Sequence, residues 1–289
     1  MPYGFIRHIE NKGYSVETVR SYEKVLNQFF AFLSKKYKKH IEPSEINPSD
    51  IKGYMKDQKE QGKSNSTINK ELAILKTFFN FLWESSTVAV DPSVKIKRYK
   101  DIKNLTVGIS YEEILKLRDN VLNNETYSNI RKAIFILAAR GLKTSDFRFK
   151  KDDVIDNSED ETVEIKLKNR RILLQGQEAD CFLEYFYETL LNGSDYVFLT
   201  KSHGEDVGEP IQVMSILTHL RNIAQDYLPE DSSPLTLILI RRAIAYDRYT
   251  NKVPIQRIAQ ELGIEEASAS NYIKILLEGN TQKVLEGEI

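Results

Sequence analysis

Apolar residues recur every three or four positions through residues 1–90, which is the spacing of amphipathic helices. Ser15 stands at the N-cap position of the longest run, and Glu17 follows in the first turn, where the helix dipole favours an anion. Ser49 and Asp50 are cap candidates for a later run, and Asp91–Pro92 ends the pattern. The pattern predicts a small helical bundle with helices over residues 5–12, 15–39, 47–60 and 66–85.

The rest of the chain combines helical periodicity with short runs typical of strands. Residues 162–165 and 171–174 flank the polar stretch 166–170 and predict a hairpin, and residues 196–199 predict a brief strand. Residues 203–208 are typical of a polar loop. The helical spacing predicts further helices over residues 111–122, 127–140, 177–191, 211–227, 237–250, 254–262 and 267–277. The fold class predicted is therefore mainly α with a small β-sheet.

The charge divides the chain where the hydrophobic pattern changes. The formal net charge of −1, from 41 Lys and Arg against 42 Asp and Glu, disfavours a polyanionic partner at first sight. Residues 1–105 nevertheless hold 19 basic and 12 acidic residues, net +7, whereas the remainder holds 22 and 30, net −8. We predict a helical domain over residues 1–93, a basic linker over 94–106 and a mixed domain over 107–289. The basic excess of residues 1–105 suits a polyanionic partner, but charge alone does not decide between a DNA-binding surface and an ordinary basic one.

Composition excludes several kinds of site. Cys181 is the only cysteine, which excludes an intramolecular disulfide and a cysteine-based zinc site. The 4 histidines are scattered without metal-ligand spacing, so we expect no metal and no cofactor. No apolar run reaches the roughly 18 residues of a membrane span, and Met1 begins no signal-peptide pattern, so we expect no membrane partner.

Seven segments, in their order along the chain, carry a resemblance to a known family. They are Ser15–Tyr22, Lys63–Lys70, Ala138–Asp146, Arg170–Leu174, Tyr196–Leu199, Leu235–Ala245 and Leu262–Ile264. In residue type, order and spacing they resemble the tyrosine recombinases, the family of the phage integrases, over almost the whole chain. The resemblance implies an N-terminal helical, SAM-like core-binding domain followed by a mixed α/β catalytic-like domain.

The resemblance also implies where the catalytic groups of the family fall. In the family a tyrosine attacks a DNA phosphodiester and forms a covalent 3′-phosphotyrosyl link. Arginines and histidines hold the phosphate and assist proton transfer, and a lysine protonates the leaving oxygen. Carried over to this chain, the positions are Lys143, Lys166 (or Lys168), Ile238, Arg241, Ile264 and Tyr272. Tyr272 lies one residue closer to the Leu262–Gly263 pair than the family pattern requires.

Three of these positions depart from the family in ways that change the chemistry. Lys143 cannot present the planar two-pronged donor that an arginine gives a phosphate. The isoleucines at 238 and 264 cannot stabilise an oxyanion or move a proton, and losing one such group commonly costs on the order of 10²–10⁴ in rate. Arg140 and Arg242 either restore positive charge at the phosphate or are solvated helix charges. We therefore expect no catalytic residues and no strand cleavage.

The candidate DNA contacts share short polar or basic side chains, at groove-facing positions of the family or beside the expected phosphate. They are Thr18, Arg20, Ser21, Lys63, Ser64, Asn65, Thr67, Asn69, Lys70, Arg98, Arg140, Lys143, Lys166, Lys168, Arg170, Arg241 and Arg242. Such groups suit phosphate contacts and some base readout. For the N-terminal members, the alternative is an ordinary capped helix with a solvated face.

The C-terminal segment permits a second interpretation, a helix-turn-helix over residues 253–277 with Ala259 inward and Gly263 at the turn. The recognition helix would then present Ser268, Ser270, Asn271 and Lys274. In that interpretation Tyr272 is an ordinary, partly buried aromatic residue.

These observations lead to a two-domain clamp on double-stranded DNA. We expect a transcriptional repressor of a phage or mobile element, similar to the recombinase-fold repressors of SPβ-like phages. Two alternatives stay open: an active, atypical recombinase using Tyr272, Arg241 and Lys166, and an accessory partner of a recombinase. We also expect homo-oligomerisation through the C-terminal helix and a cytoplasmic, nucleoid-associated location in a bacterial or phage-infected cell.

Overall fold

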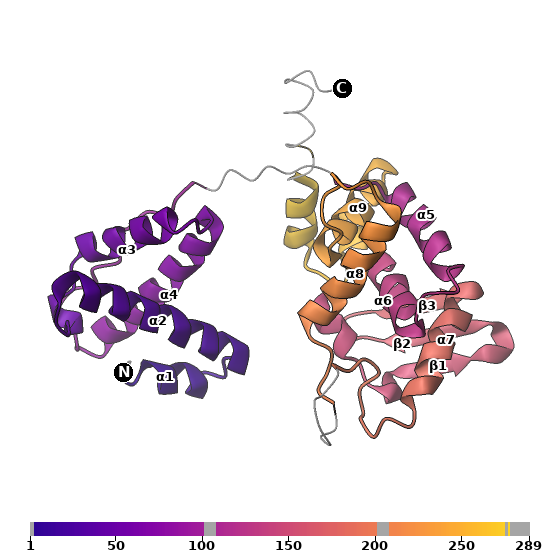
Figure 1. Ribbon diagram of the computed structural model, residues 1–289, viewed down its shortest axis with the longest axis horizontal. Helices are drawn as coiled ribbons and strands as arrows, with labels where there is room; N and C mark the ends of the chain where they lie inside the picture. The colour runs from indigo at the N-terminus through magenta and orange to yellow at the C-terminus, as the bar shows by residue number, and fades with distance from the viewer. Residues whose placement is uncertain (1–2, 101–107, 201–207, 275–276, 278–289) are drawn as a thin grey trace. The chain divides into compact units, whose positions relative to one another are not determined.

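The computed structural model describes residues 3–100, 108–200, 208–274 and 277, and the chain forms two compact units, residues 1–103 and 104–289 (Figure 1). We call them the N-terminal and the C-terminal unit. The described strands all belong to the C-terminal unit, and helices make up most of both units. The predicted mainly α fold with a small sheet is confirmed. The linker predicted over 94–106 remains a prediction, because its residues from 101 onward lie outside the described part of the chain.

The N-terminal unit is a bundle of helices around an aromatic core. The α-helices of its described residues are α1 (Phe5–Asn11), α2 (Val16–Tyr37), α3 (Pro48–Glu60) and α4 (Asn65–Glu84). Both α2 and α4 begin after a serine, Ser15 and Ser64, whose hydroxyl accepts a hydrogen bond from a backbone N–H of the first turn. The rings of Phe29, Phe78 and Phe79 are fully buried and pack edge to face in the centre.

The N-terminus of α3 is capped by Asn47, not by Ser49 or Asp50 as predicted. Pro48 occupies the first helical position, where its fixed φ fits and its missing N–H costs nothing, so the capping position moves to the residue before it. The Asn47 side chain accepts from the N–H of Ser49, and the Asp50 carboxylate accepts from the N–H of Asn47. The helix start is thus a reciprocal capping box.

Asp50 is fully buried and joins α3 to the end of α2. Lys36 Nζ and the Tyr37 hydroxyl each donate to its Oδ1 at 2.6 Å. Burial alone would raise the pKa of Asp50, but these donors outweigh burial and hold that pKa below its ordinary value. The ionised carboxylate therefore stabilises the unit above the ordinary carboxyl pKa of about 3.9. That contribution is lost as the pH falls through the lowered pKa of the folded state.

We expect Asp50→Asn to lower the free energy of unfolding of the N-terminal unit by about 2 kcal/mol at neutral pH, because it removes the charge that both donors share. The single tryptophan, Trp83, lies on α4, so its fluorescence during denaturant unfolding reports on this unit. The difference between wild type and variant should shrink as the pH falls below about 4. Glu45→Gln, which alters an exposed ion pair with Lys39, is the matched control and should change little. A pH-independent loss would contradict the account of Asp50.

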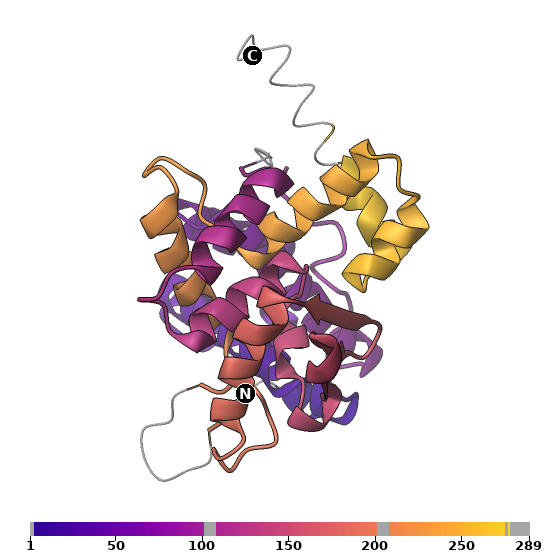
Figure 2. The same cartoon turned by 90° about the vertical axis from the view of Figure 1, so that its right-hand side faces the viewer.

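The C-terminal unit packs its helices around α6. Its helices are α5 (Tyr111–Leu122), α6 (Asn129–Ala139), α7 (Gln177–Thr189), α8 (Val213–Tyr227), α9 (Leu237–Thr250) and α10 (Ile255–Leu262), followed by a helix over residues 266–274. Every residue of α6 from Ala133 to Ala139 is buried, and α6 contacts α5, α7, α8 and α9. Figure 2 turns this unit toward the viewer, with the C-terminal helices in yellow beside α9 in orange.

A three-stranded antiparallel sheet in the order β1-β2-β3 completes the unit. Its strands are β1 (Val154–Asn157), β2 (Thr162–Lys166) and β3 (Arg171–Gln175). In the register of β2 with β3, Lys166 lies opposite Arg171, so residues 167–170 form the hairpin tip. The hairpin is where the pattern predicts it. The edge strand β1 was not predicted, because two of its four residues are polar and exposed.

Other parts of the unit differ from the prediction only locally. Tyr196 and Leu199 form isolated bridges with Lys150 and Pro210 in place of the predicted strand. Most of the predicted polar loop, residues 203–207, lies outside the described residues. No described helix combines the length and the apolar character that crossing a membrane requires.

Candidate nucleic-acid interface and active site

The turn after α6 is the point where the elements of the candidate site meet. Gly141 has a φ of +75°, and a Cβ there would come within 2.8 Å of Leu262 Cδ2, so the turn requires glycine. The Gly141 carbonyl accepts hydrogen bonds from two arginines, Arg241 and Arg170. Arg241 extends from α9 and Arg170 from the hairpin tip, so this carbonyl joins three elements.

Arg241 is directed inward. Its side chain is buried, and it donates to the carbonyls of Gly141 and, at 3.0 Å, of Leu262 at the end of α10. It therefore ties α9 to the turn after α6 and to the end of α10. The sequence interpretation placed Arg241 at the phosphate, whereas its described hydrogen bonds all go to main-chain oxygens.

Arg170 holds the same elements from the hairpin. Its side chain is only 6% exposed and donates to the carbonyls of Arg140 (3.3 Å), Gly141 (2.9 Å) and Glu261. Burial lowers the pKa of Arg170 to about 10; Asp146 opposes this shift and Arg241 adds to it. Its Nε finds no partner within the described part of the chain. A Cβ at Gly263 would lie 3.2 Å from Arg170, so glycine at the end of α10 makes room for this side chain.

Asp146 is the carboxylate that balances this cluster. Its Oδ2 lies 3.7 Å from Arg170 Nη2 and accepts from the backbone N–H of Lys143, and its Oδ1 lies 3.9 Å from Lys143 Nζ. Lys143 and Arg170 thus meet at one carboxylate, and the charge of Arg241 acts on Arg170 beside them. The excess positive charge makes this region attractive to an anion.

A cavity of about 460 Å³ opens beside the cluster. Its basic lining residues are Lys143, Arg148, Lys166, Lys168 and Arg170, and its acidic ones are Asp146 and Asp153. A neighbouring hollow shares Lys143, Asn169 and Gly263 with it and adds Ile264 and Ser268. Tyr272 lies one helical turn after Ser268, which places both on the same side of that helix. The arrangement can hold a phosphate next to a tyrosine-bearing helix.

The isoleucines and Tyr272 are placed differently from one another. Ile238, in the first turn of α9, is 55% exposed, so the position can accept a polar side chain. Ile264 and Tyr272 are partly buried and pack against the core. Arg242 is partly buried, and its Nε has no partner among the described residues. Of these four residues, only Ile264 lines one of the two hollows.

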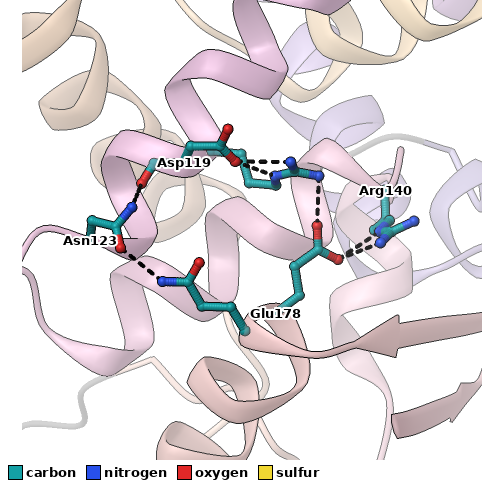
Figure 3. Close-up of polar contacts among 6 residues, drawn as sticks. Asp119, Asn123, Arg140 and Glu178 are labelled. Carbon is teal, nitrogen blue, oxygen red and sulfur yellow. Dashed lines mark hydrogen bonds and ion pairs between the residues drawn. The ribbon is translucent and has the colours of Figure 1, made fainter. Parts of the chain in front are cut away.

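Contrary to its prediction as a phosphate contact, Arg140 does not line the cavity. Its Nε and Nη2 donate to Glu178 Oε2 at 2.9 and 2.5 Å, and Arg118 Nη1 donates to Glu178 Oε1 at 3.1 Å (Figure 3). Glu178 is buried in the first turn of α7. The positive charge of Arg140 is therefore balanced inside the unit, and the residue does not line the cavity.

In the N-terminal unit, the predicted DNA contacts divide into exposed and engaged side chains. Exposed are Arg20, Ser21, Ser64, Thr67, Lys70 and Arg98, and Thr18 is partly so. Lys63 Nζ is held by buried Glu71 at 2.5 Å. The amides of Asn65 and Asn69 bind main-chain groups of residues 99 and 100.

The sequence interpretation missed Asp146 and Arg148 as lining residues and Glu178 as the partner of Arg140. A signal for Asp146 was available, because it follows Lys143 by three residues, the spacing of a capping box. Nothing in the local sequence pairs Arg140 with Glu178, which lies 38 residues away.

Comparisons with known proteins identify related chains. Residues 4–85 match the family described as phage integrase, N-terminal SAM-like domain. Tyrosine recombinase XerD of Listeria innocua serovar 6a is 24% identical over 272 residues, which cover 91% of this chain and 89% of that protein. Tyrosine recombinase XerC of Thermodesulfovibrio yellowstonii is 29% identical over 188 residues, 61% of this chain and 57% of that protein. The match to XerC thus spans little more than half of that relative.

Solved structures share the fold. A Tn1549 transposon integrase in complex with a circular intermediate DNA superposes with a TM-score of 0.70 at 15% identity, covering 98% of each chain. A lambda integrase dimer bound to a COC' core site gives a TM-score of 0.67 at 14% identity, covering 93% of this chain and 92% of that one. The family match over residues 4–85, the relatives and the shared fold all support the tyrosine recombinase family.

The expectation that the chain is not an enzyme is contradicted by these relatives, which are named tyrosine recombinases. That expectation weighed the changes at positions 143, 238 and 264 with only Arg140 and Arg242 as possible replacements for the lost charge. In the structure Arg170, which the sequence interpretation treated only as a DNA contact, brings a guanidinium to Asp146 beside Lys143. A lysine at position 143 therefore does not leave the site without an arginine.

We expect Arg170→Ala to lower the free energy of unfolding of the C-terminal unit by about 3 kcal/mol, because it removes a buried side chain and its hydrogen bonds to the carbonyls of three segments. Arg171→Ala is the matched control: Arg171 is 69% exposed and pairs with Glu164, so its loss should cost less than about 0.5 kcal/mol. Denaturant unfolding followed by far-UV circular dichroism measures both. Equal effects of the two substitutions would refute the role assigned to Arg170.

Proposed function

We propose that this chain is a site-specific tyrosine recombinase that acts on double-stranded DNA. The observation that carries the proposal is the similarity, over 272 residues, to a relative named tyrosine recombinase XerD. The basic cavity of the C-terminal unit supports it, because its five basic side chains against two carboxylates suit a phosphodiester. The integrase neighbours in complex with DNA are consistent with duplex DNA as the partner.

In the proposed reaction the Tyr272 hydroxyl oxygen attacks the phosphorus and the bond to the leaving 5′ oxygen breaks. The tyrosine proton goes to solvent, and Lys166 at the end of β2 protonates the leaving oxygen. Lys143 contacts the phosphate, and the buried charge of Arg170 behind it helps to balance the extra negative charge. Ile238 and Ile264 contribute no proton transfer, so the step should be slow compared with a site that has histidines at both positions.

Transcriptional regulation is the second candidate function. Occupancy of an operator requires affinity for DNA and no strand transfer, and the isoleucines at 238 and 264 leave the basic cavity intact. The lambda integrase neighbour is a dimer, and we extend homo-oligomerisation through the C-terminal helix to this chain as part of the proposal.

The proposal is tested with nicked duplex DNA that traps a covalent intermediate. We expect the wild type to give a protein–DNA adduct on a denaturing gel and Tyr272→Phe to give none while it retains its DNA affinity, because only the nucleophilic oxygen is removed. Tyr249→Phe, an exposed tyrosine on α9, is the matched control and should give the adduct at the wild-type rate.

Binding without any adduct would leave regulation as the function. An adduct that persists in Tyr272→Phe would assign the nucleophile to another residue. Failure to bind duplex DNA at low salt would exclude both functions.

A second prediction concerns the exposed isoleucine of α9. We expect Ile238→His to raise the rate of adduct formation by about 10- to 100-fold, because a histidine there supplies a donor and a proton-transfer group. Since Ile238 is 55% exposed, the substitution should leave stability unchanged. Ile238→Ala controls for loss of the side chain alone. An unchanged rate in Ile238→His would show that position 238 does not face the reacting phosphate.

A further inference from the structure

Residues 91–100, here called the connector segment, are bound along α4 rather than extended into solvent. Ser93 and Ile96 are buried, and the Ile96 N–H donates to the Ser93 carbonyl at 3.0 Å. Tyr99 is partly buried against the core of the N-terminal unit, and Lys59 Nζ lies 5.0 Å from the centre of its ring. Packing of these side chains against the N-terminal unit therefore already holds the segment in place.

Three side chains from α4 then bind the main chain of the connector segment. Lys76 Nζ donates to the Val94 carbonyl at 3.3 Å, and Asn65 Nδ2 donates to the Lys100 carbonyl at 2.7 Å. Between them, Asn69 makes two bonds to one residue: its Nδ2 donates to the Tyr99 carbonyl and its Oδ1 accepts from the Tyr99 N–H, both at 2.9 Å. Positions 65, 69 and 76 are spaced by four and seven residues, so they lie on one side of the helix.

Asn69 is the central contact because its side-chain amide binds both the N–H and the carbonyl of Tyr99, as the backbone of a neighbouring β-strand would. Both of its polar atoms are engaged, and it remains only partly exposed. The role predicted for it, direct contact with DNA, would require breaking these bonds. The amide therefore acts on the connector segment in the structure described.

The consequence is a fixed row of cations. Lys97, Arg98 and Lys100 are exposed, while the residues between and before them, Tyr99 and Ile96, point into the unit. A chain segment held in one conformation loses less conformational entropy on binding than a free one. Cations on such a segment therefore bind phosphates more strongly than the same cations on a free linker.

We propose that Asn69, assisted by Asn65, is a positioning residue that holds the connector segment so that Lys97, Arg98 and Lys100 form a preordered phosphate-binding row. The binding of phosphates by this row rests on the proposed DNA-binding function. The positioning of the connector segment by Asn69 does not. The two parts are tested separately.

The structural part is tested without DNA, by limited trypsin digestion of the full chain with the cut sites identified by mass spectrometry. We expect Asn69→Ala to speed cleavage after Lys97 and Arg98 by about tenfold, because cleavage requires local release of the segment. Asn80→Ala removes the same side chain from the same helix, where its amide donates to the nearby Glu84 on α4, and should leave the rate unchanged. Equal cleavage rates in wild type and Asn69→Ala would overturn the proposal.

The binding part uses a fluorescently labelled duplex of mixed sequence at low salt, where phosphate contacts dominate affinity. We expect Asn69→Ala to weaken binding about fivefold in the wild type and not at all in a Lys97→Ala/Arg98→Ala/Lys100→Ala background, because the whole row is then already lost. The same loss in both backgrounds would overturn the proposal and make Asn69 a direct DNA contact. Absence of binding by the wild type would refute the proposed function, while the trypsin result would still decide the role of Asn69.

Discussion

The C-terminal unit depends on the hydrogen bonds that two buried arginines donate to main-chain carbonyls. Arg170 and Arg241 meet at the carbonyl of Gly141 and reach on to the end of α10. Elements far apart in sequence are fixed in this way around Asp146. Because buried guanidiniums need partners, the turn after α6, the hairpin and α10 cannot shift independently. The rigidity of the basic cavity follows from this arrangement.

The same rule determines which polar groups remain for DNA. Glu178 neutralises the charge of Arg140, and Glu71 that of Lys63. The main chain of Tyr99 satisfies the side-chain amide of Asn69. A side chain satisfied within its own unit must break those bonds to contact a ligand. Lys166 and Lys168 at the cavity are exposed, as are the cations of the connector segment, and none of these side chains has such a bond among the described residues. Affinity for a phosphate backbone should therefore depend on them.

Much of the fold could be predicted from the sequence, because helix bounds follow from hydrophobic spacing and from local caps such as Ser15 and Ser64. The grouping of Lys143, Lys166 and Arg170 at one cavity followed from the resemblance to the recombinases. The partners of individual side chains could not be predicted. Glu178 lies 38 residues from Arg140, and Tyr99 lies 30 residues from Asn69, so only tertiary packing brings them together. The mistaken expectation about catalysis has the same origin, because it treated position 143 without the neighbouring Arg170.

The central claim is that the basic cavity holds the scissile phosphate beside Tyr272. A structure of the chain trapped on nicked duplex DNA tests this most directly. The account predicts a phosphate in contact with Lys143, in front of the buried Arg170, with its phosphorus bonded to the Tyr272 oxygen. Duplex DNA bound with an empty cavity, and with Tyr272 still packed against the core, would contradict it.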